Sequence, residues 1–166
     1  LILVLVIVFK MHAFLTLVLV SLITAHSEVL LYGQSGAGKT SLVKAGLIHA
    51  LVNDEGFNVL PPMRVRENVA AGRRPPGVKN VYMFNALSSI SKPDQVDGLA
   101  GVSLEEYLEK YKESAANGDA NCPTIIIFDQ FEELFTFYPE HWEDRKDFFK
   151  QVRHALKEDP LLRVLF

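Results

Sequence analysis

The sequence predicts an α/β fold in three layers, a parallel sheet with helices on both faces. Apolar segments of strand length alternate along the chain with amphipathic segments of helix length, as in successive β–α–β units. The candidate strands are apolar throughout, which is typical of strands that are buried on both faces. In such a sheet the functional site lies at the carboxyl ends of the strands, so the residues that follow each strand deserve the closest inspection.

Three segments carry the strand prediction, and a fourth is weaker. Residues 28–32 form a short apolar run that ends before a glycine, and residues 124–128 are an uncharged, mainly β-branched run. Residues 161–166 predict a last strand, with which the sequence ends. Residues 59–65 contain two adjacent prolines, so we expect at most an edge strand there.

Helices are expected where apolar residues recur every three to four positions, in the segments 39–52, 86–90, 103–113 and 139–157. Ser103 and Glu106 have the spacing of a capping box. Loops are predicted over residues 70–80 and 93–101, with a turn at 117–119. On the last helix we expect a buried face made by Trp142, Phe149, Val152 and Leu156, with Phe148 as a further core aromatic.

Composition excludes several classes of protein. With 49% hydrophobic and 22% charged residues among 166, the chain is not intrinsically disordered. A net charge of −3 offers no basic excess for a phosphate polymer, so nucleic acid is not a favoured partner. The single cysteine, Cys122, excludes an intramolecular disulfide, and no Cys/His spacing predicts a zinc site.

The chain divides into an apolar leader, residues 1–26, and one domain, residues 27–166. Residues 1–25 have the length of a membrane span and contain a single charged residue, Lys10. A lysine in the middle of a span costs roughly 2.5–3.5 kcal/mol. Two interpretations stay open: a membrane anchor on an otherwise cytoplasmic domain, and apolar core segments.

The first chemical motif follows the strand at 28–32 and opens the helix at 39. Its sequence, Gly-Gln-Ser-Gly-Ala-Gly-Lys-Thr, matches G-x-x-x-x-G-K-[ST], the phosphate-binding loop of P-loop NTPases. Glycines allow the backbone amides to close around phosphate oxygens, Lys39 reaches the β- and γ-phosphates, and Thr40 offers its hydroxyl to Mg²⁺. The candidate nucleotide-binding residues are Gly33, Gln34, Ser35, Gly36, Ala37, Gly38, Lys39, Thr40 and Ser41.

The second motif directly follows the strand at 124–128. Asp129 stands where the Mg²⁺-holding aspartate of such enzymes belongs, so Thr40 and Asp129 are the candidate metal-site residues. Glu132 and Glu133 are candidates, with Lys39, for catalysis, because a carboxylate could orient or deprotonate the attacking water. Each acidic residue has a structural alternative as a helix cap or as solvated charge in a first turn.

Together these segments resemble the novel STAND NTPases, a branch of the STAND class of signalling ATPases. The resemblance covers about residues 28–166 and rests on residues 32–47 and 127–136. It implies a partial P-loop NTPase domain that takes ATP and Mg²⁺ and acts as a signalling switch, with nucleotide-dependent self-association as a further expectation. The related NACHT proteins place an acidic pair three and four residues after the metal aspartate, where Glu132 and Glu133 stand.

Three functions remain open: a switch ATPase, a module that exchanges nucleotide slowly with incidental hydrolysis, and a membrane-anchored adaptor with a structural nucleotide site. In the family the strand at 161–166 leads to a sensor, so we expect these 166 residues alone to hydrolyse ATP slowly. Arg73 and Arg74 are the one pair that could face a phosphate in trans, although an exposed loop pair is usually solvated.

Overall fold

The computed structural model describes residues 28–29, 39–66, 74–114, 122–136 and 139–166. Their strands form one parallel sheet in the order β1-β4-β3-β2. The strands are β1 (Glu28–Val29), β2 (Asn58–Val59), β3 (Thr124–Ile127) and β4 (Leu162–Leu165). The four predicted strands are therefore confirmed, with β2 at one edge. Two prolines follow β2. Beyond them, the chain pairs with the end of β3 through a single parallel bridge, between Met63 and Phe128.

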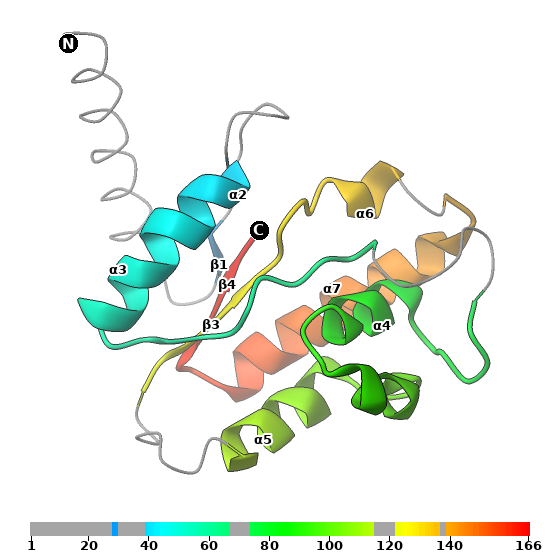
Figure 1. Ribbon diagram of the computed structural model, residues 1–166. Coiled ribbons are helices and arrows are strands. Elements are labelled where there is room, and N and C mark those ends of the chain that lie inside the picture. Colours follow the sequence, from blue (N-terminus) through cyan, green and yellow to red (C-terminus); the bar gives the residue numbers. More distant parts are fainter. Residues whose placement is uncertain (1–27, 30–38, 67–73, 115–121, 137–138) are drawn as a thin grey trace, which may run out of the picture.

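Helices cover both faces of the sheet (Figure 1). A continuous helical stretch near the N-terminus consists of α2 (Lys39–Leu42), the π-helical η1 (Val43–Leu47) and α3 (Ile48–Asn53). The remaining helices are α4 (Val81–Ser88), the 3-10 helix η2 (Pro93–Leu99), α5 (Leu104–Ser114), α6 (Glu133–Thr136), the 3-10 helix η3 (Pro139–His141) and α7 (Trp142–Glu158).

Side-chain alternation along β3 divides the core between the two faces. Ile125 and Ile127 pack in a cluster with residues of the α2–α3 stretch, such as Leu47. Ile126 and Phe128 belong to the larger cluster that includes buried residues of α4, α5 and α7. A strand that is buried on both faces carries apolar residues at every position, so the predicted three-layer arrangement is confirmed.

One helix prediction was wrong in its bounds, and one predicted loop is mostly helical. The helix expected at 86–90 begins earlier, at α4, where the Asn80 side chain caps it by accepting from the Met83 N–H. All eight residues of α4 are buried, so no polar face marked the helix in the sequence. Most of the loop expected at 93–101 is the 3-10 helix η2. Residues 70–73 and the turn at 117–119 lie outside the described residues.

The expected buried face of α7 was also partly wrong. Trp142 is 59% exposed and Phe149 is 40% exposed. The buried positions are instead Asp144, Phe148, Val152 and Ala155. These positions are spaced four, four and three apart and form a regular helical stripe, which faces the large cluster. Val152 and the further core aromatic Phe148 were correctly predicted as buried, while Leu156 packs partly buried beside them.

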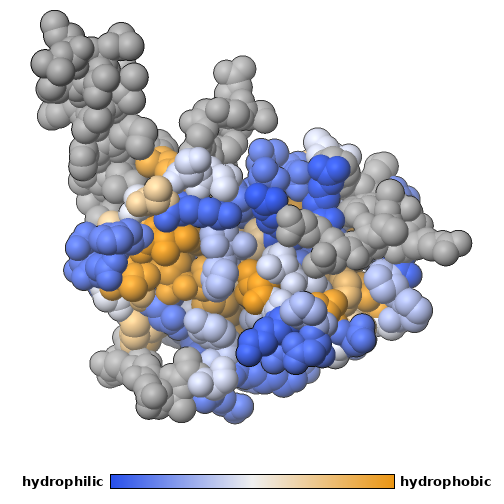
Figure 2. All heavy atoms as spheres, in the orientation of Figure 1, coloured by the Kyte–Doolittle hydropathy of each residue, from blue (hydrophilic) through white to orange (hydrophobic). Residues whose placement is uncertain are grey.

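Apolar atoms on the face shown in Figure 2 gather beside the helical stretch from Lys39 to Asn53, while hydrophilic atoms predominate around α5. No helix within the described parts of the chain is long and apolar enough to cross a membrane. The segment for which a membrane anchor was considered, residues 1–25, lies outside the described residues.

Candidate functional site

Asp129 is the centre of the candidate site, at the carboxyl end of the β3 strand. Its side chain is only 9% exposed. Oxygen Oδ1 accepts a hydrogen bond of 2.7 Å from the Thr40 hydroxyl, and Oδ2 lies 3.4 Å from Nη2 of Arg64. Thr40 and Asp129 are 89 residues apart in the sequence. The structure therefore brings together one residue from each of the two predicted motifs.

The backbone around Asp129 is held by neighbours on both sides of β3. Phe128 donates its N–H to the Leu165 carbonyl at 2.8 Å, and Asp129 donates its N–H to the Met63 carbonyl at 2.8 Å. Gln130 then adopts a φ of 57°, a left-handed conformation that non-glycine residues rarely take. Backbone outliers of this kind cluster at functional sites, where the surrounding structure has to stabilise them.

Thr40 stands in the first turn of α2, the segment in which the phosphate-binding motif was expected to become helical. Lys39 is the first residue of α2, and Ser41 is exposed on the same turn. The other motif residues, Gly33, Gln34, Ser35, Gly36, Ala37 and Gly38, lie outside the described residues. The part of the predicted phosphate-binding loop that the structure describes is its helical end, and Thr40 from this end contacts Asp129.

A small hollow opens at this edge of the sheet. Its lining includes Val43 from the helical stretch after Thr40, and Leu165 and Phe166 at the end of β4. The acidic motif contributes Asp129 and Glu132. The hollow therefore lies between the acidic motif and the helical stretch that follows Thr40, at the carboxyl ends of β3 and β4, where an open α/β sheet binds its ligand.

The sequence model of the family described as Novel STAND NTPase 1 matches residues 13–166. The chain belongs to this family. No curated protein and no solved structure shows a significant match to it. Family membership agrees with the resemblance noted from the two motifs, and it covers every described element of the sheet and of the site.

The oxygen donors of this STAND NTPase site suit a Mg²⁺ ion. The Thr40 hydroxyl donates its hydrogen to Asp129, so the lone pairs of the hydroxyl oxygen remain available to a cation. Among the described residues, no group of three or more His, Cys, Asp or Glu side chains is arranged so that it could hold a metal ion. One carboxylate and one hydroxyl nevertheless fit Mg²⁺, because this ion usually takes one or two protein ligands together with substrate phosphates and water.

The two glutamates of the acidic motif have different surroundings. Glu133 opens α6, and its Oε1 lies 3.3 Å from Nη1 of Arg66. Glu132 is exposed and lines the hollow that contains Asp129. Glu133 is thus engaged in an ion pair, whereas Glu132 stands beside the place where a ligand would bind.

Arg64 and Arg66 were not among the predicted site residues, although each contacts a carboxylate of the acidic motif. Both follow two prolines, in and next to the segment 59–65 for which at most an edge strand was predicted. The alternation Arg-Val-Arg was the available signal, because residues two apart in an extended segment point to the same side. Val65 between them is buried, which agrees with that alternation.

The hypothesis that Arg74 faces a phosphate in trans is not supported by its contacts. Its Nη2 donates to both carboxylate oxygens of Asp144 at 2.8 Å, and its Nη1 donates to the Lys79 carbonyl at 2.7 Å. Arg74 therefore joins the loop before α4 to the start of α7. Arg73 lies outside the described residues.

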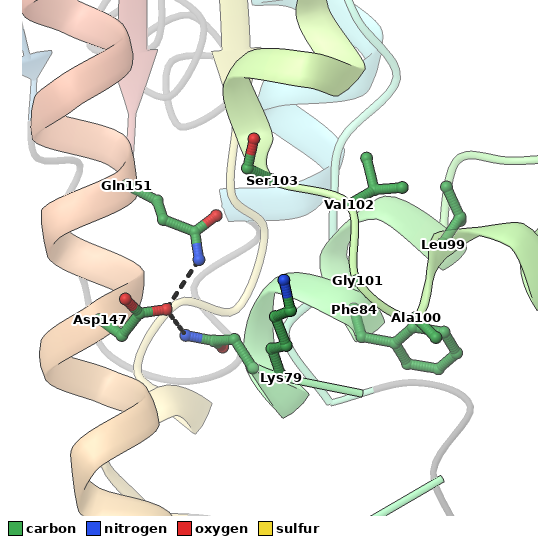
Figure 3. A pocket seen from close by; sticks show the side chains of 10 residues that line it. Lys79, Phe84, Leu99, Ala100, Gly101, Val102, Ser103, Asp147 and Gln151 are labelled. Atoms are coloured by element: carbon green, nitrogen blue, oxygen red, sulfur yellow. Dashed lines mark hydrogen bonds between the residues drawn. The ribbon is translucent and has the colours of Figure 1, made fainter. Parts of the chain in front are cut away.

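A larger cavity of about 330 Å³ lies away from Asp129, between the start of α4, the end of η2 and α7 (Figure 3). Its polar groups bond mainly to one another. Asp147 accepts from Gln151 at 2.7 Å and from Asn80 at 2.8 Å, while Gln151 accepts from the Leu104 N–H at 3.2 Å. These bonds join α4, α5 and α7, so we assign this polar cluster to the fold.

Proposed function

We propose that the chain is the nucleotide-binding core of a STAND-type signalling switch, which binds ATP with Mg²⁺ between residues 33–41 and Asp129. The observation that carries the proposal is the 2.7 Å hydrogen bond between Thr40 and Asp129. Two motifs typical of P-loop NTPases meet through it, at the edge of a parallel sheet where ligands bind. Membership in a family of NTPases supports the same function.

Each residue has a role that follows from its chemistry. The backbone amides of residues 33–38 would cradle the phosphates, and the Lys39 ammonium would neutralise the β- and γ-phosphates. Thr40 and Asp129 would hold Mg²⁺, whose contribution is to neutralise charge on the phosphate oxygens. Asp129 also orients the Thr40 hydroxyl by accepting its hydrogen, so that the lone pairs face the cation.

For hydrolysis, Glu132 is the stronger candidate to position the attacking water. Glu132 lines the hollow that contains Asp129, and Glu133 is not part of that lining. A carboxylate within hydrogen-bonding reach of a water can orient it and accept its proton. In this proposal Glu133 keeps the start of α6 in place, and Glu132 acts on the water.

Nucleotide binding is tested by isothermal titration calorimetry of the 166-residue chain with ATP and Mg²⁺. Lys39→Ala should weaken ATP binding by at least about tenfold, since hydrogen bonds to charged groups contribute about 1.5–3 kcal/mol. Lys44→Ala is the matched control, because Lys44 is exposed one turn further along the same helical stretch. An unchanged ATP affinity in Lys39→Ala, or an equal loss in Lys44→Ala, would refute the assignment of the site.

A phosphate-release assay distinguishes a switch that turns over from a module that exchanges nucleotide slowly. Multiple turnovers by the wild-type chain, lost in Glu132→Gln, support hydrolysis at this site. Tight binding without release of phosphate would support the slow-exchange module instead. Both measurements use the same protein preparation, so a failure to bind and a failure to hydrolyse are distinguished.

A further inference from the structure

The chain segment after β2 runs along the end of β3 (Figure 1). It brings the Arg64 side chain to Asp129. Met63 donates its N–H to the Ile127 carbonyl and accepts from the Asp129 N–H, both at 2.8 Å. These two bonds hold Met63 in register with the last residues of β3. Arg64, the next residue, is consequently held at the level of Asp129.

The opposite side of this segment is attached to α4 and the turn that follows it. The Arg64 N–H donates to the Ser89 hydroxyl at 3.0 Å, and the Asn85 side chain donates to the Val65 carbonyl at 2.9 Å. Asn85 is fully buried. The backbone around Arg64 is therefore hydrogen-bonded on two sides, which fixes the point from which its side chain extends.

The guanidinium of Arg64 makes a long contact with Asp129. One nitrogen lies 3.4 Å from Oδ2, and the Arg64 side chain is 32% exposed. By contrast, the 2.8 Å bonds between Arg74 and Asp144 are short. Arg66 is directed to a different carboxylate, Glu133. Arg64 thus stands next to the Mg²⁺-directed carboxylate through a weak, partly solvated contact.

We propose that Arg64 is a further nucleotide-binding residue, which turns from Asp129 to the terminal phosphate of the nucleotide. The proposal rests on the function proposed above. A divalent cation held by Thr40 and Asp129 would repel the guanidinium, while the phosphate oxygens would attract it. The planar fork of an arginine matches phosphate geometry with two parallel hydrogen bonds. Arg64 would therefore distinguish a nucleoside triphosphate from a diphosphate.

The test compares the affinities of ATP and ADP, both with Mg²⁺, in the wild-type chain and in Arg64→Ala. We expect the ratio of ATP to ADP affinity to fall by about tenfold, since the bond to a charged phosphate is lost with ATP only. Arg64→Lys should lose part of this ratio, because a lysine keeps the positive charge but not the fork. This second variant also serves if the alanine variant does not fold.

The control variant is Arg74→Ala, which breaks the other arginine–aspartate pair. It should lower stability in thermal unfolding and leave the ratio of ATP to ADP affinity unchanged. If Arg64 only positioned Asp129, its loss would weaken ATP and ADP equally, and an unchanged ratio would overturn the inference. If the wild-type chain bound neither nucleotide, the proposed function would fail as well, so the two failures are distinguishable.

Discussion

Two aspartates of this protein have the same exposure and opposite surroundings. The side chains of Asp129 and Asp144 are each 9% exposed, and each contacts one arginine. Asp144 accepts two bonds of 2.8 Å from Arg74 and one of 2.9 Å from the Val81 N–H. Asp129 accepts one short bond from a hydroxyl and has its arginine at 3.4 Å.

The difference separates a carboxylate that builds the fold from one that is suited to hold a cation. Asp144 bonds to a backbone amide at the start of α4 and to the loop before it, which joins α7 to both. Three hydrogen bonds from protein donors occupy most of its acceptor capacity. Asp129 lines a hollow at the carboxyl ends of β3 and β4. Burial alone therefore does not distinguish the two aspartates, whereas their hydrogen-bond partners do.

The largest effect is expected on stability from Asp144→Asn. The Arg74 side chain is 36% exposed and stays solvated, so we expect a loss of about 1–3 kcal/mol, the range for leaving a buried hydrogen-bonding group without its partner. The free energy of unfolding should be measured by urea denaturation, with Glu143→Gln as the control, because Glu143 is an exposed residue in the first turn of the same helix. If Asp144→Asn lowered the free energy of unfolding by less than about 1 kcal/mol, Asp144 would not be the aspartate that stabilises the fold.

The next effect is expected on turnover, from the two glutamates after Asp129. Glu132→Gln should keep ATP binding and lower the rate of phosphate release by about a hundredfold, the lower range for loss of a general base. Glu133→Gln should change the rate less, because Glu133 is engaged with Arg66. A larger loss of turnover in Glu133→Gln than in Glu132→Gln would mean that their roles are exchanged.

A smaller effect is expected on the Mg²⁺ dependence of nucleotide binding, from Asp129→Asn. The amide keeps the shape of the side chain but removes the charge directed at the cation, so the Mg²⁺ concentration needed for half-maximal ATP binding should rise about tenfold. The same substitution should change the urea midpoint much less than Asp144→Asn does. If Asp129→Asn strongly destabilised the protein and left the Mg²⁺ dependence of ATP binding unchanged, Asp129 would have the structural role and not the cation-directed one.

The smallest effect is expected from Glu106, an exposed carboxylate with a purely structural role. Its Oε2 accepts the Ser103 N–H at 3.0 Å and the Ser103 hydroxyl accepts the Glu106 N–H, which confirms the predicted capping box. The bond from the Ser103 backbone lowers the pKa of Glu106 below its ordinary value of 4.5. Because the folded pKa is lowered, its stabilisation is complete above about pH 4.5 and is lost as the pH falls through the folded value.

Glu106→Gln should therefore slightly reduce the difference between the melting temperatures at neutral and at acid pH. It should not change nucleotide binding. Thermal unfolding followed from pH 7 to pH 3 measures this. If the melting temperature of Glu106→Gln fell between pH 7 and pH 3 as much as that of the wild-type chain, the capping box would contribute nothing measurable to α5. The comparison of Asp129 with Asp144 would not be affected.

Much of the fold followed from local patterns along the chain. The β-branched run at 124–128 predicted β3, and the capping spacing of Ser103 and Glu106 predicted the start of α5. The predictions failed where burial removed the pattern. Helix α4 is buried on all sides, so its residues showed no amphipathic period, and on α7 several apolar residues competed for the buried face.

The candidate site was predictable to the extent that its chemistry is local. The phosphate-binding motif and Asp129 could be identified from residue types and their position after strands, because glycines, a lysine and a carboxylate carry their chemistry in any such context. The contact between Thr40 and Asp129 could only be expected in outline. Arg64 and Arg66 were not assigned, because their alternation around Val65 shows that they share a side but not which carboxylates they contact.

The sequence by itself therefore determined the alternation of strands and helices, the types of site residues and the family resemblance. Local spacing and propensity are sufficient for these. Only the tertiary structure decided which carboxylate each arginine contacts and which of two equally buried aspartates is saturated by the fold. Those contacts join segments more than sixty residues apart, such as Arg64 with Asp129 and Arg74 with Asp144. Partners at that separation are chosen by strand order and helix packing, which no local pattern of residues contains.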